Sequence, residues 1–283
     1  MSDGPTASGA DGGAMSGVEE LFDSVADVYD TVIDYFGRFG ERLVQAARLG
    51  SGAKVLDLAC GRGAVLRPAL AAVSDTGSVL GIDVASNMVE LLSADLAASG
   101  VANAEVRCGD AAHLALPDAS FDAVTGGFMI FFPSDPLRVV AEVRRVLRPG
   151  GRLALSVFDG GAGFPFQSEL EAAVGAAGRR VPGPGGRFNE ASVLYAALED
   201  AGFGGVETVE MRERFEFGSL EQVERWQRST GVRRVLETLD DAQLAAYRNG
   251  LAARLERFRA DPTGGAAFAL DQRAVAVIAD APS

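Results

Sequence analysis

Short apolar runs alternate with helix-forming segments between Ala53 and Phe158, and this rhythm limits the fold more than any other feature. The runs are AKVLDLAC, GSVLGIDVA, AEVRCGD, FDAVTGGFMIFF and RLALSVF. Segments with apolar residues at helical spacing lie between most of them. Short apolar strands connected by helices are typical of a parallel sheet that is covered on both faces. We therefore expect an α/β fold.

Helix boundary signals support this division of the chain. Ser86 is placed to cap the helix after the second strand, and Gly100 is placed to end it. Asp135 followed by Pro136 predicts the start of another helix before the fifth strand. Strand four is expected to run from residue 121 through residue 132.

The flanking segments predict four regions in the chain. Residues 1–17 are rich in Gly, Ser, Ala and Asp, which predicts a disordered tail. Residues 18–50 are expected to form a helical cover, residues 51–158 the cofactor-binding core, and residues 159–283 the rest of the sheet. Within the last region, residues 219–259 read as two or three helices inserted before the final strand, where they would form a lid.

Composition excludes several classes of function. The 283 residues carry a formal net charge of -13, which argues against a nucleic-acid or anionic-membrane partner. One histidine and two cysteines provide neither a metal cluster nor a disulfide framework. No apolar run reaches the ~18 residues of a membrane helix, and no signal peptide is evident. We expect a cytoplasmic protein, either a monomer or a homodimer.

The stretch VLDLACGRGAV combines a strand-tip carboxylate, Asp57, with a turn built on Gly61 and Gly63. A dinucleotide-binding turn needs a third glycine, but Leu66 stands at that position, and Asp57 would repel a pyrophosphate. A nucleotide with a cationic end removes this conflict. S-adenosylmethionine fits because it has no phosphate and carries an ammonium and a sulfonium. A nicotinamide-dependent oxidoreductase is the disfavoured alternative.

Two more acids follow at the tips of the next two strands. Asp83 is placed to accept hydrogen bonds from both ribose hydroxyls, and Asp110 is placed to meet the exocyclic amine of adenine. Either residue alone could be a helix cap or a solvated loop residue. Together with Asp57, they predict one crevice at the carboxyl edge of the sheet.

These motifs give the chain a family resemblance. LDLACGRG, GIDVASNM, GDAAHLALPDASFDAV and EVRRVLRPGGRLAL, preceded by FDSVADVYD, resemble the class I S-adenosylmethionine-dependent methyltransferases, in the branch of the quinone-biosynthesis enzymes. The resemblance implies a Rossmann-like, mostly parallel seven-stranded sheet with helices on both faces. It also implies an N-terminal helical cover and a helical lid over the acceptor site.

The resemblance also implies a set of cofactor contacts, which follow from the methionine end to the adenine. The methionine end would be held by Asp57 with the backbone of Ala59, Gly61 and Gly63. Gly127 and Phe128 would lie beside its amine and Tyr29 at its carboxylate. Asp83 would bind the ribose, Val84 and Met88 would pack on ribose and adenine, and Asp110 with the backbone of Ala111 would contact the adenine.

The expected activity is methyl transfer from S-adenosylmethionine to a small-molecule or peptide acceptor in secondary metabolism. We expect transfer to oxygen, on a carboxylate or a phenol. Transfer to carbon or nitrogen remains an alternative, as does a non-methylating protein that binds S-adenosylmethionine.

No catalytic residue is assigned from the sequence. Relatives often place histidines after strand four, where this chain has FMIFFPSDP, and the lone His113 is expected to be a loop residue. The acceptor is therefore expected to react as an anion, which a lid arginine could pair with as it enters. The lid arginines considered for this pairing are Arg225, Arg228, Arg233 and Arg234.

Overall fold

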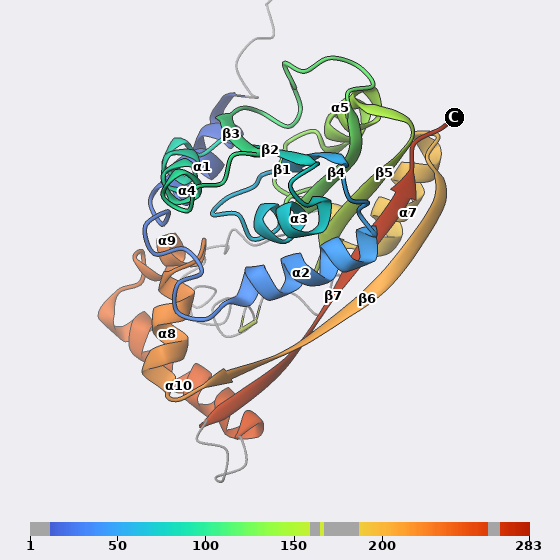
Figure 1. Ribbon diagram of the computed structural model, residues 1–283. Coiled ribbons are helices and arrows are strands. Elements are labelled where there is room, and N and C mark those ends of the chain that lie inside the picture. The colour runs from blue at the N-terminus through green and yellow to red at the C-terminus, as the bar shows by residue number, and fades with distance from the viewer. Residues whose placement is uncertain (1–11, 159–164, 167–186, 260–266) are drawn as a thin grey trace, which may run out of the picture.

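The computed structural model describes residues 12–158, 165–166, 187–259 and 267–283 (Figure 1). Most of the expected tail, residues 1–11, lies outside the described residues. Helix α1 spans Gly12–Asp23 and therefore begins within the segment that the sequence assigns to the tail. The described residues contain no helix that is both long and apolar enough to cross a membrane.

The described residues form one seven-stranded sheet in the order β3-β2-β1-β4-β5-β7-β6. Strands β1 to β5 pair in parallel, whereas β7 is antiparallel to both β5 and β6. The mostly parallel seven-stranded sheet expected from the sequence is confirmed. The strands are β1 (Lys54–Leu58), β2 (Ser78–Asp83), β3 (Ala104–Cys108), β4 (Phe121–Gly127), β5 (Leu147–Val157), β6 (Gly204–Phe217) and β7 (Phe268–Asp280).

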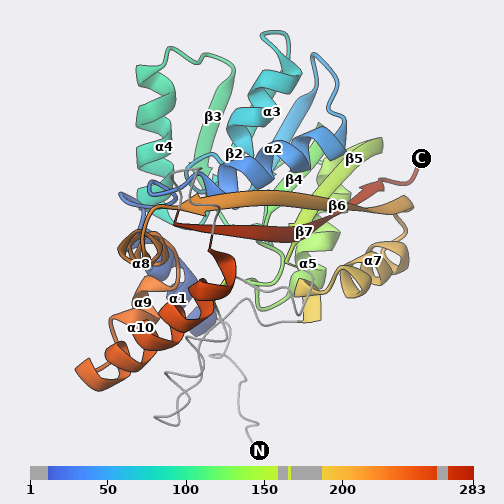
Figure 2. The same cartoon turned by 90° about the horizontal axis from the view of Figure 1, so that it is seen from below.

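Helices cover both faces of this sheet (Figures 1 and 2). Helices α2 (Tyr35–Ala47) and α3 (Leu66–Val73) pack together on one face. Helices α5 (Pro136–Val146) and α7 (Ala191–Asp200) lie on the other, and α4 (Ser86–Ala98) packs against β2 and β3. The buried strands need apolar partners on each side, which explains their nearly continuous apolar sequences.

The segment between β6 and β7 forms helices α8 (Leu220–Arg228), α9 (Arg233–Leu236) and α10 (Asp241–Leu255). Short 3-10 turns occur at Arg187–Asn189 and Glu256–Phe258. Helix α1 lies between α4 and this inserted group, at one end of the molecule (Figures 1 and 2). Residues far apart in the sequence therefore meet beside the carboxyl ends of the central strands.

Two local predictions need correction, and two are confirmed. Strand β4 ends at Gly127 rather than at residue 132, because Phe128 adopts a left-handed backbone with φ of 52°. Ser86 does not cap α4, since Ala85 occupies the cap position and makes no side-chain cap bond. By contrast, Gly100 follows the end of α4 with φ of 68°, and Asp135 caps α5 by accepting from Arg138 N at 3.0 Å.

Candidate cofactor and acceptor site

A large pocket opens at the carboxyl ends of β1, β2 and β4. Strand order reverses between β1 and β4, and crevices at such switch points are the usual ligand sites of open α/β sheets. Side chains from α1, α2 and the α8–α9 turn complete its wall. The pocket has two chemically different ends, one built around carboxylates and one built around aromatic rings.

Asp57 is the most deeply buried acid of the pocket, with 1% of its surface exposed. Its Oδ1 accepts a hydrogen bond of 2.7 Å from Thr125 Oγ1, while its Oδ2 has no partner among the described residues. Burial raises the pKa of Asp57 to about 7, while the Thr125 bond and the backbone N–H of Leu66 oppose the shift and nearby Asp83 adds to it. A buried carboxylate oxygen that lacks a full hydrogen bond, as Oδ2 does, is costly, so this site favours a cationic ligand.

The turn after β1 provides a backbone cradle beside Asp57. Ala59 and Gly61 have φ of 50° and 48°, in the left-handed region that non-glycine residues rarely enter. Both line the pocket, as does Phe128 with its own left-handed backbone. Backbone strain of this kind concentrates at ligand sites.

Gly63 is the one predicted contact that does not line the pocket as the structure describes it. Its φ is 89°, and a Cβ there would lie 2.9 Å from Leu92 Cδ1 on α4. The positive φ and this close approach both favour glycine here. A contact of Gly63 with the cofactor stays a prediction.

Asp83 connects the glycine turn to the start of α4. Its Oδ2 accepts from Gly61 N at 2.8 Å, and its Oδ1 accepts from Ala85 N at 2.9 Å. Each carboxylate oxygen has a second lone pair, so two hydroxyl donors can still be accepted. Burial raises the pKa of Asp83, and the charge of Asp23 raises it further.

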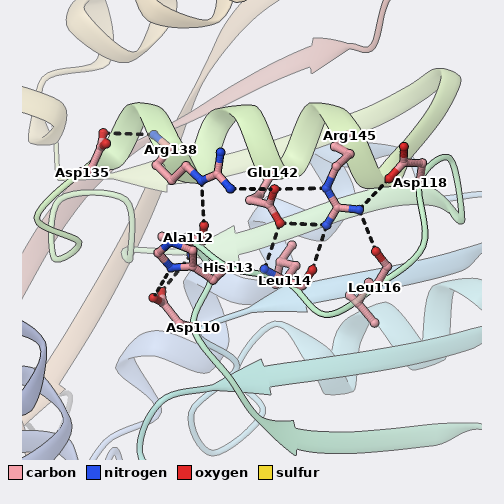
Figure 3. A network of polar contacts seen from close by, with 10 residues as sticks. All are labelled: Asp110, Ala112, His113, Leu114, Leu116, Asp118, Asp135, Arg138, Glu142 and Arg145. Carbon is pink, nitrogen blue, oxygen red and sulfur yellow. Dashed lines mark hydrogen bonds and ion pairs between the residues drawn. The ribbon is translucent and has the colours of Figure 1, made fainter.

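Asp110 lies at the pocket wall in the loop after β3 (Figure 3). Its Oδ1 accepts from Ala112 N at 2.8 Å, and its Oδ2 lies 3.0 Å from Nδ1 of His113. The His113 side chain is 71% exposed and does not line the pocket. This placement agrees with its interpretation as a loop residue.

Helix α5 holds the loop that carries Asp110 (Figure 3). Glu142 Oε2 accepts from Leu114 N at 2.9 Å, and Arg145 donates to the carbonyl oxygens of Leu114 and Leu116 at 2.8 and 2.7 Å. Arg145 lowers the pKa of Glu142, which keeps this carboxylate ionised. The network positions the loop rather than acting on a ligand, because neither charged residue lines the pocket.

Aromatic rings surround the other end of the pocket. Phe128 stacks on Phe158 with 4.3 Å between ring centroids, and Tyr29 stacks on Phe36 at 5.3 Å. Phe22 of α1 meets Phe132 edge-on at 5.4 Å. Together with Met129, Val232 and Val235, these rings make this end of the pocket apolar.

The inserted helices contribute apolar residues to the pocket, but none of the four lid arginines lines it. Arg233 donates to Ser24 O at 3.2 Å, and Arg234 donates to Gly17 O at 3.4 Å. The suggested pairing of a lid arginine with the acceptor therefore stays a prediction that the pocket lining does not support. Two of these arginines hold α1 instead.

Several lining residues were missed by the sequence analysis. Phe36, Arg62 and Ser156 lie next to predicted elements, so only their side-chain directions were unknown. Val232 and Val235 belong to an ordinary apolar helix pattern about 150 residues beyond the cofactor motifs, and no local signal distinguishes them.

The chemistry of the pocket lining fits S-adenosylmethionine. An unpartnered buried carboxylate suits an ammonium, and Asp83 retains acceptors for a diol. A pyrophosphate at the same turn would face Asp57. The described residues hold no cluster of His, Cys, Asp or Glu that would bind a metal ion. The pocket therefore fits S-adenosylmethionine better than a dinucleotide.

Comparison with known proteins agrees with this fit. Residues 55–151 match the model of the methyltransferase domain family. The chain is 40% identical over 137 residues to nocamycin O-methyltransferase of Saccharothrix syringae. These residues cover 48% of this chain and 49% of that protein. The chain is 36% identical over 152 residues to aklanonic acid methyltransferase DauC of Streptomyces sp. (strain C5), and these residues cover 53% of this chain and 69% of that protein.

Demethylmenaquinone methyltransferase of Lactococcus lactis subsp. lactis (strain IL1403) is 35% identical over 141 residues, which cover 48% of this chain and 56% of that enzyme. The match thus spans about half the length of this relative and of the nocamycin enzyme.

Solved structures show the same fold. The [4+2]-cyclase SpnF has a TM-score of 0.58 at 20% identity, covering 95% of this chain and 97% of that one. Phosphoethanolamine N-methyltransferase 2 of Haemonchus contortus has a TM-score of 0.60 at 16% identity, covering 92% and 57%. The sequence matches decide against a nicotinamide-dependent oxidoreductase. The chain belongs to the class I S-adenosylmethionine-dependent methyltransferases, with demethylmenaquinone methyltransferases among its relatives.

Proposed function

We propose that this methyltransferase transfers a methyl group to an oxygen of a small, largely apolar natural-product acceptor that reacts as an anion. The observation that carries this proposal is the contrast between the two ends of the pocket. The three acids lie with the glycine turn, whereas the described lining beyond them consists mostly of aromatic and aliphatic side chains. Such a wall suits a ring system better than a polar peptide.

Each cofactor contact has a chemical reason. The unpartnered Oδ2 of Asp57 accepts from the ammonium of the methionine moiety, beside the backbone of Ala59 and Gly61. Gly127 and Phe128 flank this group from the end of β4. Burial raises the pKa of Tyr29, so its hydroxyl stays protonated and can donate to the methionine carboxylate.

The nucleoside end is held by the next two strand tips. Asp83 accepts from both ribose hydroxyls, while Val84 and Met88 pack against the ribose and adenine. Asp110 accepts from the adenine amine, and the backbone of Ala111 lies at the same edge. Both assignments use carboxylates that the fold already orients through backbone N–H donors.

S-adenosylmethionine supplies an electrophilic methyl group on a sulfonium. The chain must hold a nucleophile about 3 Å from that methyl, align it and exclude water. Among the described residues, the aromatic end presents no histidine and no carboxylate that could remove a proton. An acceptor that is already ionised needs no such base.

This chemistry favours an acidic phenol or enol over a carboxylate. A conjugated oxyanion spreads its charge over a ring system. This lowers the hydration free energy that the anion loses when it enters an apolar pocket without a charged partner. Two similar proteins are a nocamycin O-methyltransferase and an aklanonic acid methyltransferase. Both names describe the methylation of a metabolite, which supports this proposal.

The test is a panel of matched acceptors incubated with S-adenosylmethionine. The panel contains acidic polycyclic phenols, aromatic carboxylates, amines and neutral alcohols of similar size. Mass analysis for a gain of one methyl, followed by NMR assignment of its position, should show the acidic phenols as the best substrates. Methylation confined to nitrogen or carbon would overturn the proposal, and Asp57→Asn serves as the inactive control.

A further inference from the structure

The N-terminus of α4 obtains its cap from another helix. Ala85 precedes α4 and offers no side-chain oxygen, so the first-turn N–H groups need an external acceptor. Asp23, the last residue of α1, provides it. Its Oδ1 accepts from Asn87 N at 2.8 Å, and Asn87 Nδ2 donates back to Asp23 O at 3.3 Å. A carboxylate here also faces the positive end of the helix dipole.

The same turn of α4 carries the ribose end of the proposed cofactor site. Asp83 lies directly before it, and its Oδ1 holds Ala85 N at 2.9 Å. Asp23 lies close enough to raise the pKa of Asp83 through its charge. A movement of α1 therefore changes the electrostatic surroundings of Asp83.

A small hydrophobic cluster accompanies this polar link. Val25, Ala26, Ala85 and Met88 are buried together, and this cluster is separate from the main core. Phe22 and Tyr29 pack against it and also line the pocket. The fully buried members of the cluster come only from the start of α4 and the segment after α1, and Phe22 and Tyr29 connect it to the main core through Phe132 and Phe36.

The opposite side of α1 is fastened to the inserted helices. Arg233 donates to Ser24 O, and Arg234 donates to Gly17 O and pairs with Glu20 at 3.6 Å. These groups are largely exposed, and exposed pairs contribute little to stability. The Asp23–Asn87 bonds are also exposed, but they satisfy a helix N-terminus, and such caps typically contribute about 1 kcal/mol, which is about fivefold in an equilibrium constant.

We propose that Asp23 is a positioning residue that slows cofactor release by tying α1 to the N-terminus of α4. It acts through Phe22 and Tyr29, which α1 and its following turn hold over the pocket. The inference rests on the proposed placement of S-adenosylmethionine between Asp57 and Asp83. It adds a residue that touches neither cofactor nor acceptor.

The test measures the dissociation rate of S-adenosylhomocysteine from the full chain by rapid mixing, together with the melting temperature. Asp23→Ala removes a helix cap, and typical cap losses correspond to a rate increase of about fivefold. Asp23→Asn retains an acceptor of similar capping strength and should stay within about twofold of the unchanged protein. Asp240→Ala is the matched control, because Asp240 caps α10 away from the pocket.

The outcomes separate the possible failures. A lower melting temperature for Asp23→Ala with an unchanged dissociation rate would overturn the inference, as would an asparagine variant as impaired as the alanine variant. If Asp23→Ala does not fold, Asn87→Ala removes the reciprocal bond and should raise the rate by about twofold; an unchanged rate would count against the inference. Failure of the unchanged protein to bind S-adenosylhomocysteine would instead refute the cofactor site.

Discussion

The two ends of the pocket are built in different ways. At the cofactor end, Asp57, Asp83 and Asp110 follow successive strands and are held by nearby backbone groups or by Thr125. At the acceptor end, the rings come from α1, α2, the loop after β4 and the end of β5. The first end therefore depends on short motifs, and the second depends on how distant segments pack.

The difference also appears in the energetics of the ligand-free protein. The cofactor end buries carboxylates whose pKa values are raised. Their ionised forms are therefore destabilised until a cation binds. The acceptor end buries rings against one another and gains from that contact. One end is arranged for binding at a cost in stability, whereas the other is part of the protein's packing.

The strongest test of this contrast is Asp57→Asn. Removing one partner of a buried charge pair typically costs about 2–5 kcal/mol, so cofactor affinity should fall by about 30-fold or more. The ligand-free variant should melt at a higher temperature, because a buried charge without a partner is gone. Titration calorimetry and thermal unfolding measure the two effects, and exposed Asp118→Asn is the control. Retained affinity would contradict the assignment of Asp57.

The pH dependence of cofactor affinity should show the same asymmetry. Burial raises the pKa of Asp57 to about 7, and a bound ammonium favours its ionised form. Binding below that pH releases a proton, so affinity should rise by up to about tenfold per pH unit toward pH 7 and then level off. Calorimetry in buffers of different ionisation enthalpy detects the proton. Asp57→Asn should flatten the profile.

The stability of the ligand-free protein should change with pH in the opposite direction. The pKa values of Asp57 and Asp30 both rise to about 7 on folding, mainly through burial. Between pH ~4 and ~7 the folded chain then binds more protons than the unfolded chain. The contribution of these two groups to stability is therefore lost as pH rises through that range, and added cofactor should restore the part due to Asp57.

At the acceptor end, Phe132→Ala should weaken acceptor binding and leave the cofactor alone. Phe132 is partly buried and meets Phe22 edge-on, so its loss removes apolar contact from the wall. We expect the acceptor KM to rise by about fivefold and the Kd of S-adenosylhomocysteine to stay within about twofold. A comparable loss of cofactor affinity would show that the two ends are not separable. Phe132→Leu should recover most of the KM.

The smallest effect is expected from His113→Ala. The His113 side chain is mostly exposed and does not itself line the pocket. It pairs with Asp110, which does. Turnover should fall by less than tenfold, whereas loss of a general base typically costs about 10²–10⁴-fold. A hundredfold drop in turnover would make His113 the base.

The sequence predicted the cofactor end closely because strand tips of a parallel sheet converge by topology. Once the βα alternation is recognised, Asp57, Asp83 and Asp110 must lie along one edge. Of the residues expected at the cofactor, all but Gly63 line the pocket. For Gly63 the structure offers a second reason for glycine, its close approach to Leu92, and the two reasons look alike in sequence.

The sequence by itself determined the fold class, the family and the acids at the cofactor end, since these follow from local periodicity and short motifs. Only the tertiary structure decided that Asp23 rather than Ser86 caps α4, that Arg233 and Arg234 hold α1, and which rings form the acceptor wall. The polar contacts among these join residues 64 to 217 positions apart in the sequence. Many pairings are compatible with such local patterns, and only the packing of the whole chain selects one.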